Sequence, residues 1–149
     1  MIEVFENTDR DNILSWLYKP SIWVAACGSV VGVTKPEDVL ALKGIIFLSI
    51  KTDGVDRGFV ACVPFDNKKD VLSVHCSLST VGTLTFIALK KAIRYLKNKG
   101  YVKLVTYYAS DDDACENITS LLGFTENKEL ASVAGFTPIC QYTYKQLYI

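Results

Sequence analysis

The sequence predicts an α/β (α+β) fold in which a mixed, mostly antiparallel sheet contains a parallel central strand pair and carries helices on both faces. Three runs of β-branched and aromatic residues follow one another between turn clusters, which predicts an antiparallel meander. A long amphipathic segment then joins the third run to a further strand, and such a crossover connects parallel strands. Residues 1–149 are 50% hydrophobic, so they are expected to form a single domain around one core.

The first third of the chain is predicted to be helix and loop. Thr8, with Asp11 three positions later, resembles a capping box, and apolar residues follow at helical spacing over residues 13–17. Residues 21–27 indicate a further short helical turn. Residues 36–40 begin with proline and two acidic residues, which favours another helix start.

The meander is predicted over three runs: 45–50, 58–65 and 71–78. Turn residues at 52–54 and 66–67 separate them. We therefore expect three neighbouring antiparallel strands.

A long helix is predicted from Leu84 to Asn98, with Gly100 as its C-terminal stop. Its spacing places Leu89, Ile93 and Leu96 on the buried face. The exposed face is expected to carry Lys90, Lys91, Arg94 and Lys97.

The C-terminal third is predicted to alternate strand and helix. Residues 101–107 indicate a strand, and the carboxylates at 111–113 favour the start of a helix that runs to Leu122. Residues 125–131 and 139–148 are expected to pair as closing strands.

The charges exclude a strong electrostatic attraction to polyanions, since Lys plus Arg and Asp plus Glu both number 16. The basic stripe of the long helix lacks an interleaved aromatic platform, so we expect no nucleic-acid partner. No apolar run approaches the length of a membrane span and no signal peptide is evident, so we expect no membrane partner. The five cysteines have no zinc or redox spacing and are interpreted as buried thiols in a cytoplasmic protein.

Two segments carry a resemblance to a known superfamily. Residues 71–78, leading into a helix, and the stretch Ile118-Thr119-Ser120-Leu121-Leu122-Gly123-Phe124 resemble the GNAT N-acetyltransferases. Residues 13–23, with the turn Pro20-Ser21-Ile22-Trp23, are similar to GNAT-like proteins encoded by bacteriophages. The resemblance implies that strands 71–78 and 101–107 are parallel neighbours and splay apart at their C-terminal ends.

The resemblance also implies a loop that wraps the pyrophosphate of acetyl-CoA. The family pattern is Gln/Arg-x-x-Gly-x-Gly/Ala, whereas this chain has Ser79-Thr80-Val81-Gly82-Thr83-Leu84-Thr85. Only one glycine remains and no basic residue is present, so the cofactor-binding candidates Val81, Gly82, Thr83, Leu84 and Thr85 form a degenerate loop. We expect Leu84 to occupy the place of the phosphate, and Thr83 is alternatively a plain helix N-cap.

The family's proton donor is also missing. The positions that correspond to its asparagine and its tyrosine hold Asp112 and Thr119, and a threonine hydroxyl is too weak an acid to replace a phenol. The remaining catalytic candidates are His75, Tyr107 and Tyr108, each of which can equally be a packed strand residue. Residues 111–113 are interpreted as a helix cap, so we expect no metal. Of the five cysteines, Cys76 and Cys115 are considered as nucleophiles but are expected in the core.

Two functions remain open. The first is a protein with a decayed acetyl-CoA site and no cofactor, acting as a binding or structural component, such as part of a phage virion or a phage-host interaction. It would need a protein partner, a phage structural protein or a second copy, and the candidate surface is the aromatic segment Trp16, Tyr18, Ile22 and Trp23. The alternative is a divergent GNAT N-acetyltransferase that transfers acetyl from acetyl-CoA to an amine.

Overall fold

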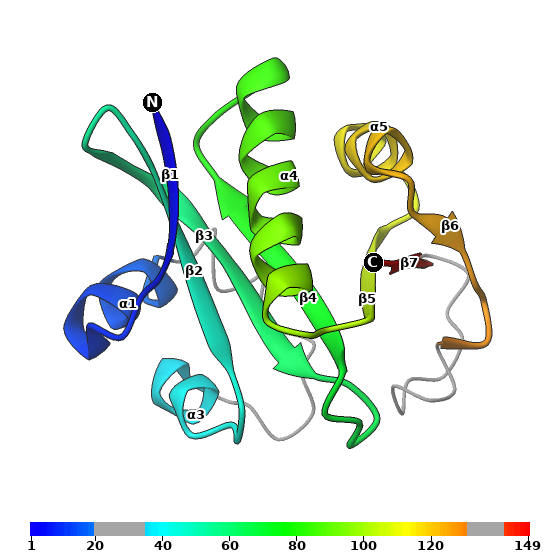
Figure 1. Cartoon of the computed structure of the whole chain (residues 1–149), viewed down its shortest axis with the longest axis horizontal. Coiled ribbons are helices and arrows are strands. Elements are labelled where there is room, and N and C mark those ends of the chain that lie inside the picture. The colour runs from blue at the N-terminus through cyan, green and yellow to red at the C-terminus, as the bar shows by residue number, and fades with distance from the viewer. Residues whose placement is uncertain (20–34, 131–141) are drawn as a thin grey trace.

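The computed structural model describes residues 1–19, 35–130 and 142–149 (Figure 1). The short helical turn expected at 21–27 lies outside these residues, as do parts of both closing strands expected at 125–131 and 139–148. The strands are β1 (Ile2–Glu6), β2 (Ile46–Thr52), β3 (Val55–Pro64), β4 (Val71–Leu78), β5 (Lys103–Ala109), β6 (Thr125–Glu126) and β7 (Tyr142–Tyr148). The helices are α1 (Arg10–Leu17), α3 (Pro36–Leu40), α4 (Thr83–Asn98) and α5 (Asp113–Leu122).

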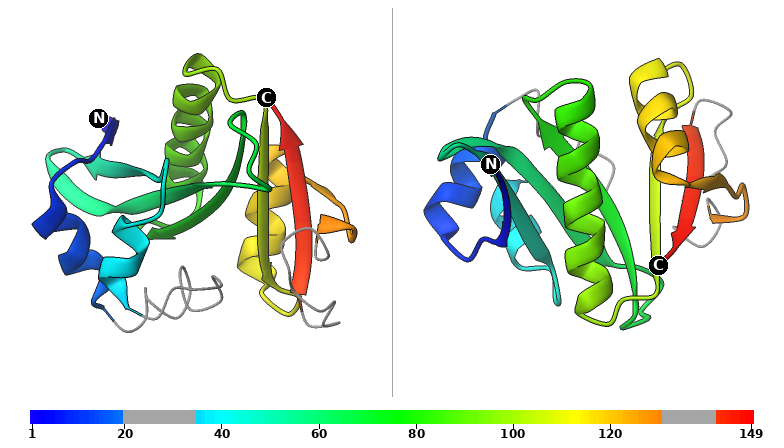
Figure 2. Two further views of the ribbon diagram at one scale, coloured as in Figure 1. Left: turned by 90° about the horizontal axis from the view of Figure 1, so that it is seen from below. Right: turned by 45° about the horizontal axis from the view of Figure 1, so that its top comes forward.

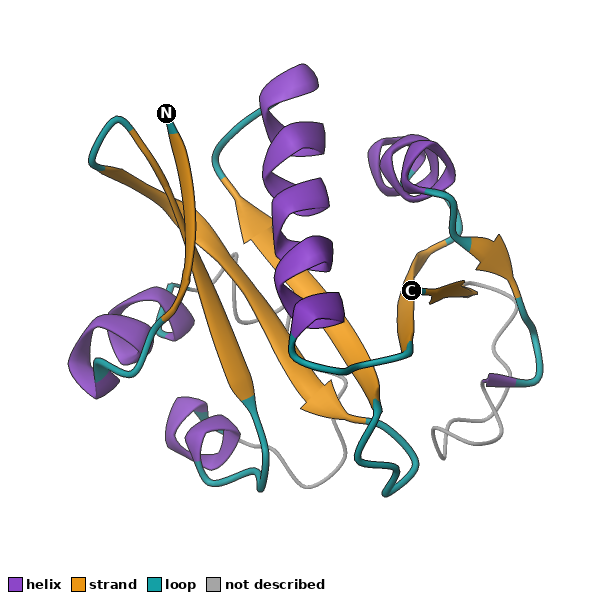
Figure 3. Cartoon of the chain, viewed as in Figure 1, coloured by secondary structure: helices purple, strands orange, loops and turns teal. Residues whose placement is uncertain are grey.

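The strands form one sheet in the order β1-β2-β3-β4-β5-β7-β6 (Figure 3). β4 and β5 pair in parallel, and the other neighbouring strands pair antiparallel. The predicted mixed sheet with a parallel central pair is therefore confirmed. The parallel pair follows from α4, which returns the chain across the sheet between these two strands.

Helices cover both faces of the sheet, as predicted. Side chains alternate between the faces along a strand. Leu48 of β2 packs in the cluster that contains Leu96 of α4, while its neighbour Phe47 packs with Leu17 of α1 on the opposite face. Two separate views show α1 and α3 across the sheet from α4 (Figure 2).

The N-terminal segment differs from the prediction of helix and loop. Residues 2–6 form the edge strand β1, which pairs with β2 from Ile2↔Thr52 to Glu6↔Leu48. The cap of α1 is Asp9, whose carboxylate accepts a hydrogen bond from the backbone N–H of Asn12, so the expectation of Thr8 as the cap was wrong.

The long helix has most of the predicted face. Leu89 and Leu96 are buried, and the basic residues Lys90, Lys91, Arg94 and Lys97 are exposed. Ile93 is only half-buried, so its predicted full burial was wrong. The reason is an open groove beside it, between α4 and α5.

The predicted helix after the acidic triplet is confirmed as α5. The Asp112 carboxylate accepts from the backbone N–H of Cys115, and Gly123 ends the helix in the left-handed region with φ 95°. None of the helices in the described ranges is long and apolar enough to cross a membrane.

Candidate functional site

The parallel strands β4 and β5 separate part of the way along their length. They pair from Val71↔Lys103 to Ser73↔Val105, and no register pair follows. Just beyond, the hydroxyl of Thr106 donates to the carbonyl of Val74 at 2.8 Å. Figure 2 shows β5 and β7 running away from β4 at an angle. The predicted parallel neighbours that splay at their C-terminal ends are therefore present.

The separation exposes backbone groups of β4. The carbonyl of Val74 faces β5, since it accepts from Thr106. Backbone groups two residues apart on a strand point to the same side, so the N–H and carbonyl of Cys76 face the gap. An extended chain lying there can hydrogen-bond to them as a short extra strand would.

A groove in two connected parts follows the gap. The inner part, of about 600 Å³, lies between α4 and α5 over the separated strands. The outer part, of about 850 Å³, lies beside the loop before α4. Both parts share Cys76, Leu89, Cys115 and Ile118 in their walls, and among the described residues no lysine or arginine lines either part.

The loop candidates lie at the outer part, with one exception. Val81, Gly82, Thr83 and Thr85 line it, whereas Leu84 does not and its side chain is 39% exposed. Leu84 therefore forms no part of the groove wall.

The N-cap of α4 is Gly82, so the interpretation of Thr83 as the cap is wrong. Gly82 has φ 60° and ψ −134°, a conformation that L side chains rarely adopt. Within the described part of the chain no side-chain hydrogen bond caps the helix, and Thr83, Thr85 and Phe86 of its first turn line the outer groove.

His75 and Tyr107 lie side by side across the gap. Their ring centroids are 4.9 Å apart, and Ser73 Oγ lies 2.8 Å from His75 Nε2. Tyr107 also contacts Tyr142 and Tyr144, so it belongs to an aromatic cluster on the face opposite α4. Burial lowers the pKa of His75 to about 4, which makes its imidazole neutral at physiological pH.

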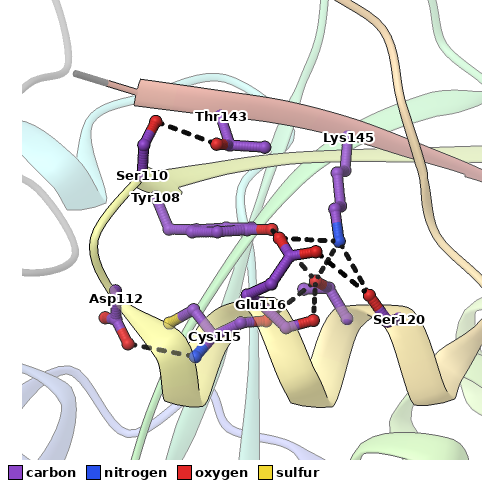
Figure 4. A network of polar contacts seen from close by, with 9 residues as sticks. Tyr108, Ser110, Asp112, Cys115, Glu116, Ser120, Thr143 and Lys145 are labelled. Carbon is purple, nitrogen blue, oxygen red and sulfur yellow. Dashed lines mark hydrogen bonds and ion pairs between the residues drawn. The ribbon is translucent and has the colours of Figure 1, made fainter.

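Tyr108 points to the other face and belongs to a polar network with α5 and β7 (Figure 4). Its hydroxyl donates to the Glu116 carboxylate, and the Thr119 hydroxyl lies 3.4 Å away. Lys145, 4% exposed, contacts Glu116 at 3.2 Å and donates to Thr119 at 2.9 Å and to Ser120 at 3.1 Å. The phenol proton of Tyr108 is thus held by Glu116, and the network fastens α5 to the sheet.

The charges in this network support one another. Hydrogen bonds from Tyr108 and then Lys145 lower the pKa of Glu116. Burial and the contact with Glu116 raise the pKa of Tyr108. Burial alone would lower the pKa of Lys145, but its contacts with Tyr108 and Glu116 outweigh this effect and raise it.

We expect Glu116→Gln to lower the melting temperature at pH 7, because Lys145 loses the anionic partner of a buried charge. The folded pKa of Glu116 lies below its unfolded value, so its stabilising effect is present above the unfolded pKa of 4.5 and is lost as the pH falls through the folded pKa. The difference between wild type and variant should therefore shrink toward pH 3. Thermal melts at pH 7 and pH 3 measure this, with the exposed Glu129→Gln as control; equal differences at both pH values would contradict it.

Two cysteines expected in the core instead face the groove. Cys76 is exposed and Cys115 is half-buried, and both line the two parts of the groove. The groove walls around the two thiols desolvate their thiolate forms, which raises the pKa of Cys76 to about 11 and that of Cys115 to about 12, so neither thiol is an activated nucleophile at neutral pH. Cys62 is buried, as predicted, while Cys27 and Cys140 lie outside the described residues.

Several solved structures with the same architecture are acetyltransferases. A GNAT-family acetyltransferase from Streptococcus pneumoniae has a TM-score of 0.65 at 13% identity, with 100% of this chain and 99% of that chain covered. The ribosomal-protein-S18-alanine N-acetyltransferase from Escherichia coli has a TM-score of 0.65 at 12% identity, with coverage of 100% and 94%. An acetyltransferase from Streptococcus agalactiae has a TM-score of 0.69 at 9% identity, with coverage of 99% and 98%.

Sequence comparison adds no closer relationship: no protein-family model matches the chain, and no curated protein matches it. The structural likeness, together with the splayed parallel pair and the long crossover helix, establishes the architecture. The chain has the fold of the GNAT acetyltransferases.

Proposed function

We propose that the protein binds the pantetheine arm of an acyl-CoA-type thioester and transfers the acyl group to an amine. The observation that carries this proposal is the continuous groove that runs from the start of α4 to the gap between β4 and β5. A donor whose long arm ends in a thioester fits a groove that begins at helix N–H groups and ends at exposed strand backbone.

Backbone groups would hold the donor. The outer groove offers Gly82 and the first-turn N–H groups of α4, which suit a phosphate group. The N–H of Cys76 can donate to a carbonyl oxygen of the arm or of the thioester. Since no cationic side chain lines the groove within the described residues, we expect weaker binding than a site with arginine or lysine would give.

Acyl transfer requires an amine to attack the thioester carbonyl carbon. A C–N bond forms, the C–S bond breaks, and the thiolate leaves with the electron pair. His75 reaches the inner groove from the strand beside the gap. Because its pKa is about 4, His75 accepts a hydrogen bond from the amine and orients it, and the amine proton passes to water.

The other named side chains have different roles in this proposal. Tyr107 packs against His75 and sets the orientation of the ring. Tyr108 holds α5 in place through Glu116 and does not protonate the leaving thiolate.

A second candidate is a binding or assembly role, in a phage particle or elsewhere, without acyl transfer. Exposed apolar side chains near the outer groove favour it: Val81 is 84% exposed, Leu121 69% and Ile87 41%. The aromatic segment proposed for this role from the sequence is only partly described, because Ile22 and Trp23 lie outside the described residues.

Binding of CoA separates the two candidates. With a dissociation constant of about 100 μM, 1 mM CoA adds about 1.4 kcal/mol of stability by mass action. At about 2 to 4 °C per kcal/mol, the melting temperature should rise by roughly 3 to 6 °C. A rise below about 1 °C would favour the binding or assembly role and a decayed donor site.

A blocked groove provides the control. Cys115→Trp places an indole at the junction of the two groove parts and should remove the shift with CoA. Asp111→Trp adds the same side chain at an exposed position outside the groove walls and should leave the shift unchanged. A shift that survives Cys115→Trp would place CoA elsewhere and would contradict the proposal.

A further inference from the structure

The inner groove has more apolar wall than an acetyl group needs. Its deep end is lined by Leu89, Ala92, Ile93 and Leu96 of α4, by Ile118 and Leu122 of α5, and by Leu104 and Phe124 below them. The inner groove as a whole measures about 600 Å³, and apolar walls that stay open to water lose the stabilisation that burial would give. Unfilled apolar volume of this size lowers stability, so its persistence needs an explanation.

Half-buried side chains show where packing is missing. On α4, Ile93 stands between the buried Leu89 and Leu96 yet remains half-buried. On α5, Ile118 and Leu122 are half-buried as well, and the only buried residue of that helix is Thr119. The two helices thus present facing apolar walls that do not close on each other.

Polar groups at this end of the groove already have partners. The hydroxyl of Thr106 donates to the carbonyl of Val74, and the hydroxyl of Thr119 donates to the carbonyl of Cys115 at 2.8 Å. Asp112 is the one charged side chain among the described residues that line the inner groove, and it caps the N-terminus of α5, the opposite end of that helix from Leu122. An occupant there needs no hydrogen bonds and gains only from apolar contact.

We infer that the deep end of the inner groove holds the alkyl chain of a medium-chain acyl donor, of about six to ten carbons along the roughly 10 Å that α4 rises from Leu89 to Leu96. This inference rests on the proposed function, since it names the acyl group that the same groove receives. The thioester lies at the gap between β4 and β5, and the chain continues between α4 and α5.

Neutral thioesters of N-acetylcysteamine test the inference without the phosphates of CoA. Calorimetric titration should show the octanoyl thioester binding at least about a hundredfold more tightly than the acetyl thioester, because each buried methylene contributes about fourfold. Equal affinities for the two thioesters, or binding of neither, would overturn the inference. CoA itself, titrated in parallel, decides the proposed function separately: CoA binding without a chain-length effect leaves that function standing.

Variants on opposite walls locate the chain. Ile93→Trp and Leu122→Trp each fill the deep end from one helix, and in each the ratio of octanoyl to acetyl affinity should fall to below about tenfold. Lys90→Trp adds the same side chain on the exposed face of α4 and should keep the wild-type ratio. Two variants are used in case one of them does not fold. If the ratio of octanoyl to acetyl affinity stays unchanged in a folded Ile93→Trp or Leu122→Trp protein, the placement of the alkyl chain in the inner groove is overturned.

Discussion

Gly58→Ala is expected to destabilise the protein by about 3 to 5 kcal/mol. Gly58 lies on β3 opposite Leu78 and has φ 129°, a conformation unfavourable for any residue with a Cβ atom. An added Cβ would also stand 1.9 Å from the carbonyl oxygen of Ser77, a backbone atom that cannot rotate away. The end of β4, which borders the outer groove through Ser77 and Leu78, would have to move.

Chemical denaturation measures this loss, and Gly54→Ala is the matched control. Gly54 also has a positive φ, 79°, but an added Cβ there meets nothing within 4 Å. Its replacement should cost only the backbone strain of about 1 to 2 kcal/mol. If the two variants lose equal stability, the close approach of β3 and β4 has no energetic effect.

Leu96→Ala is expected to destabilise the fold by about 2 to 5 kcal/mol. Leu96 is 1% exposed and packs in the cluster under α4 with Leu72 and Leu104 from the parallel strands. Removing its side chain leaves a cavity that the neighbouring strands fill only in part. Denaturation midpoints at constant slope give the difference directly.

Leu121→Ala is the comparison for this second variant. The residue type is the same, but Leu121 is 69% exposed on α5. Its replacement should change stability by less than about 0.5 kcal/mol. A small effect at Leu96, similar to that at Leu121, would mean that α4 does not anchor the two parallel strands.

Much of the architecture could be predicted from the sequence because its signals are local. The apolar spacing of Leu89 and Leu96 fixes the face of α4, and the acidic triplet with Gly123 marks both ends of α5. The long helix lies between two strands in the sequence, and a helical crossover of this length connects parallel strands. These signals need no knowledge of distant partners.

The errors occurred where distant partners decide the structure. Residues 2–6 form β1 because they pair with the open edge of β2, where Thr52, the partner of Ile2, lies 50 positions later in the chain. No local pattern reveals that distant partner. Cys76 was expected in the core because strand residues of its type are usually covered. It is exposed because β5 has already diverged from β4 at that point.

The candidate site was predictable in its location but not in its details. Four of the five loop candidates, Val81, Gly82, Thr83 and Thr85, do border the groove, and the position of His75 beside the gap follows from its place on β4. The contact of Tyr108 with Glu116 and Lys145 depends on the register between β5 and β7, which sets Thr106 opposite Lys145. A sequence read in order gives no sign of that register.

The short pairing between β4 and β5 also divides the sheet into two parts. In the first part, β1 to β4 pair along most of their length. The second part consists of β5, β7 and β6, and Lys145 of β7 contacts Glu116 of α5 and so holds that helix to it. The two parts of the sheet are joined by the three residue pairs from Val71↔Lys103 to Ser73↔Val105. Because only these three pairs join the two parts, the angle between the parts sets both the curvature of the sheet and the width of the groove between α4 and α5.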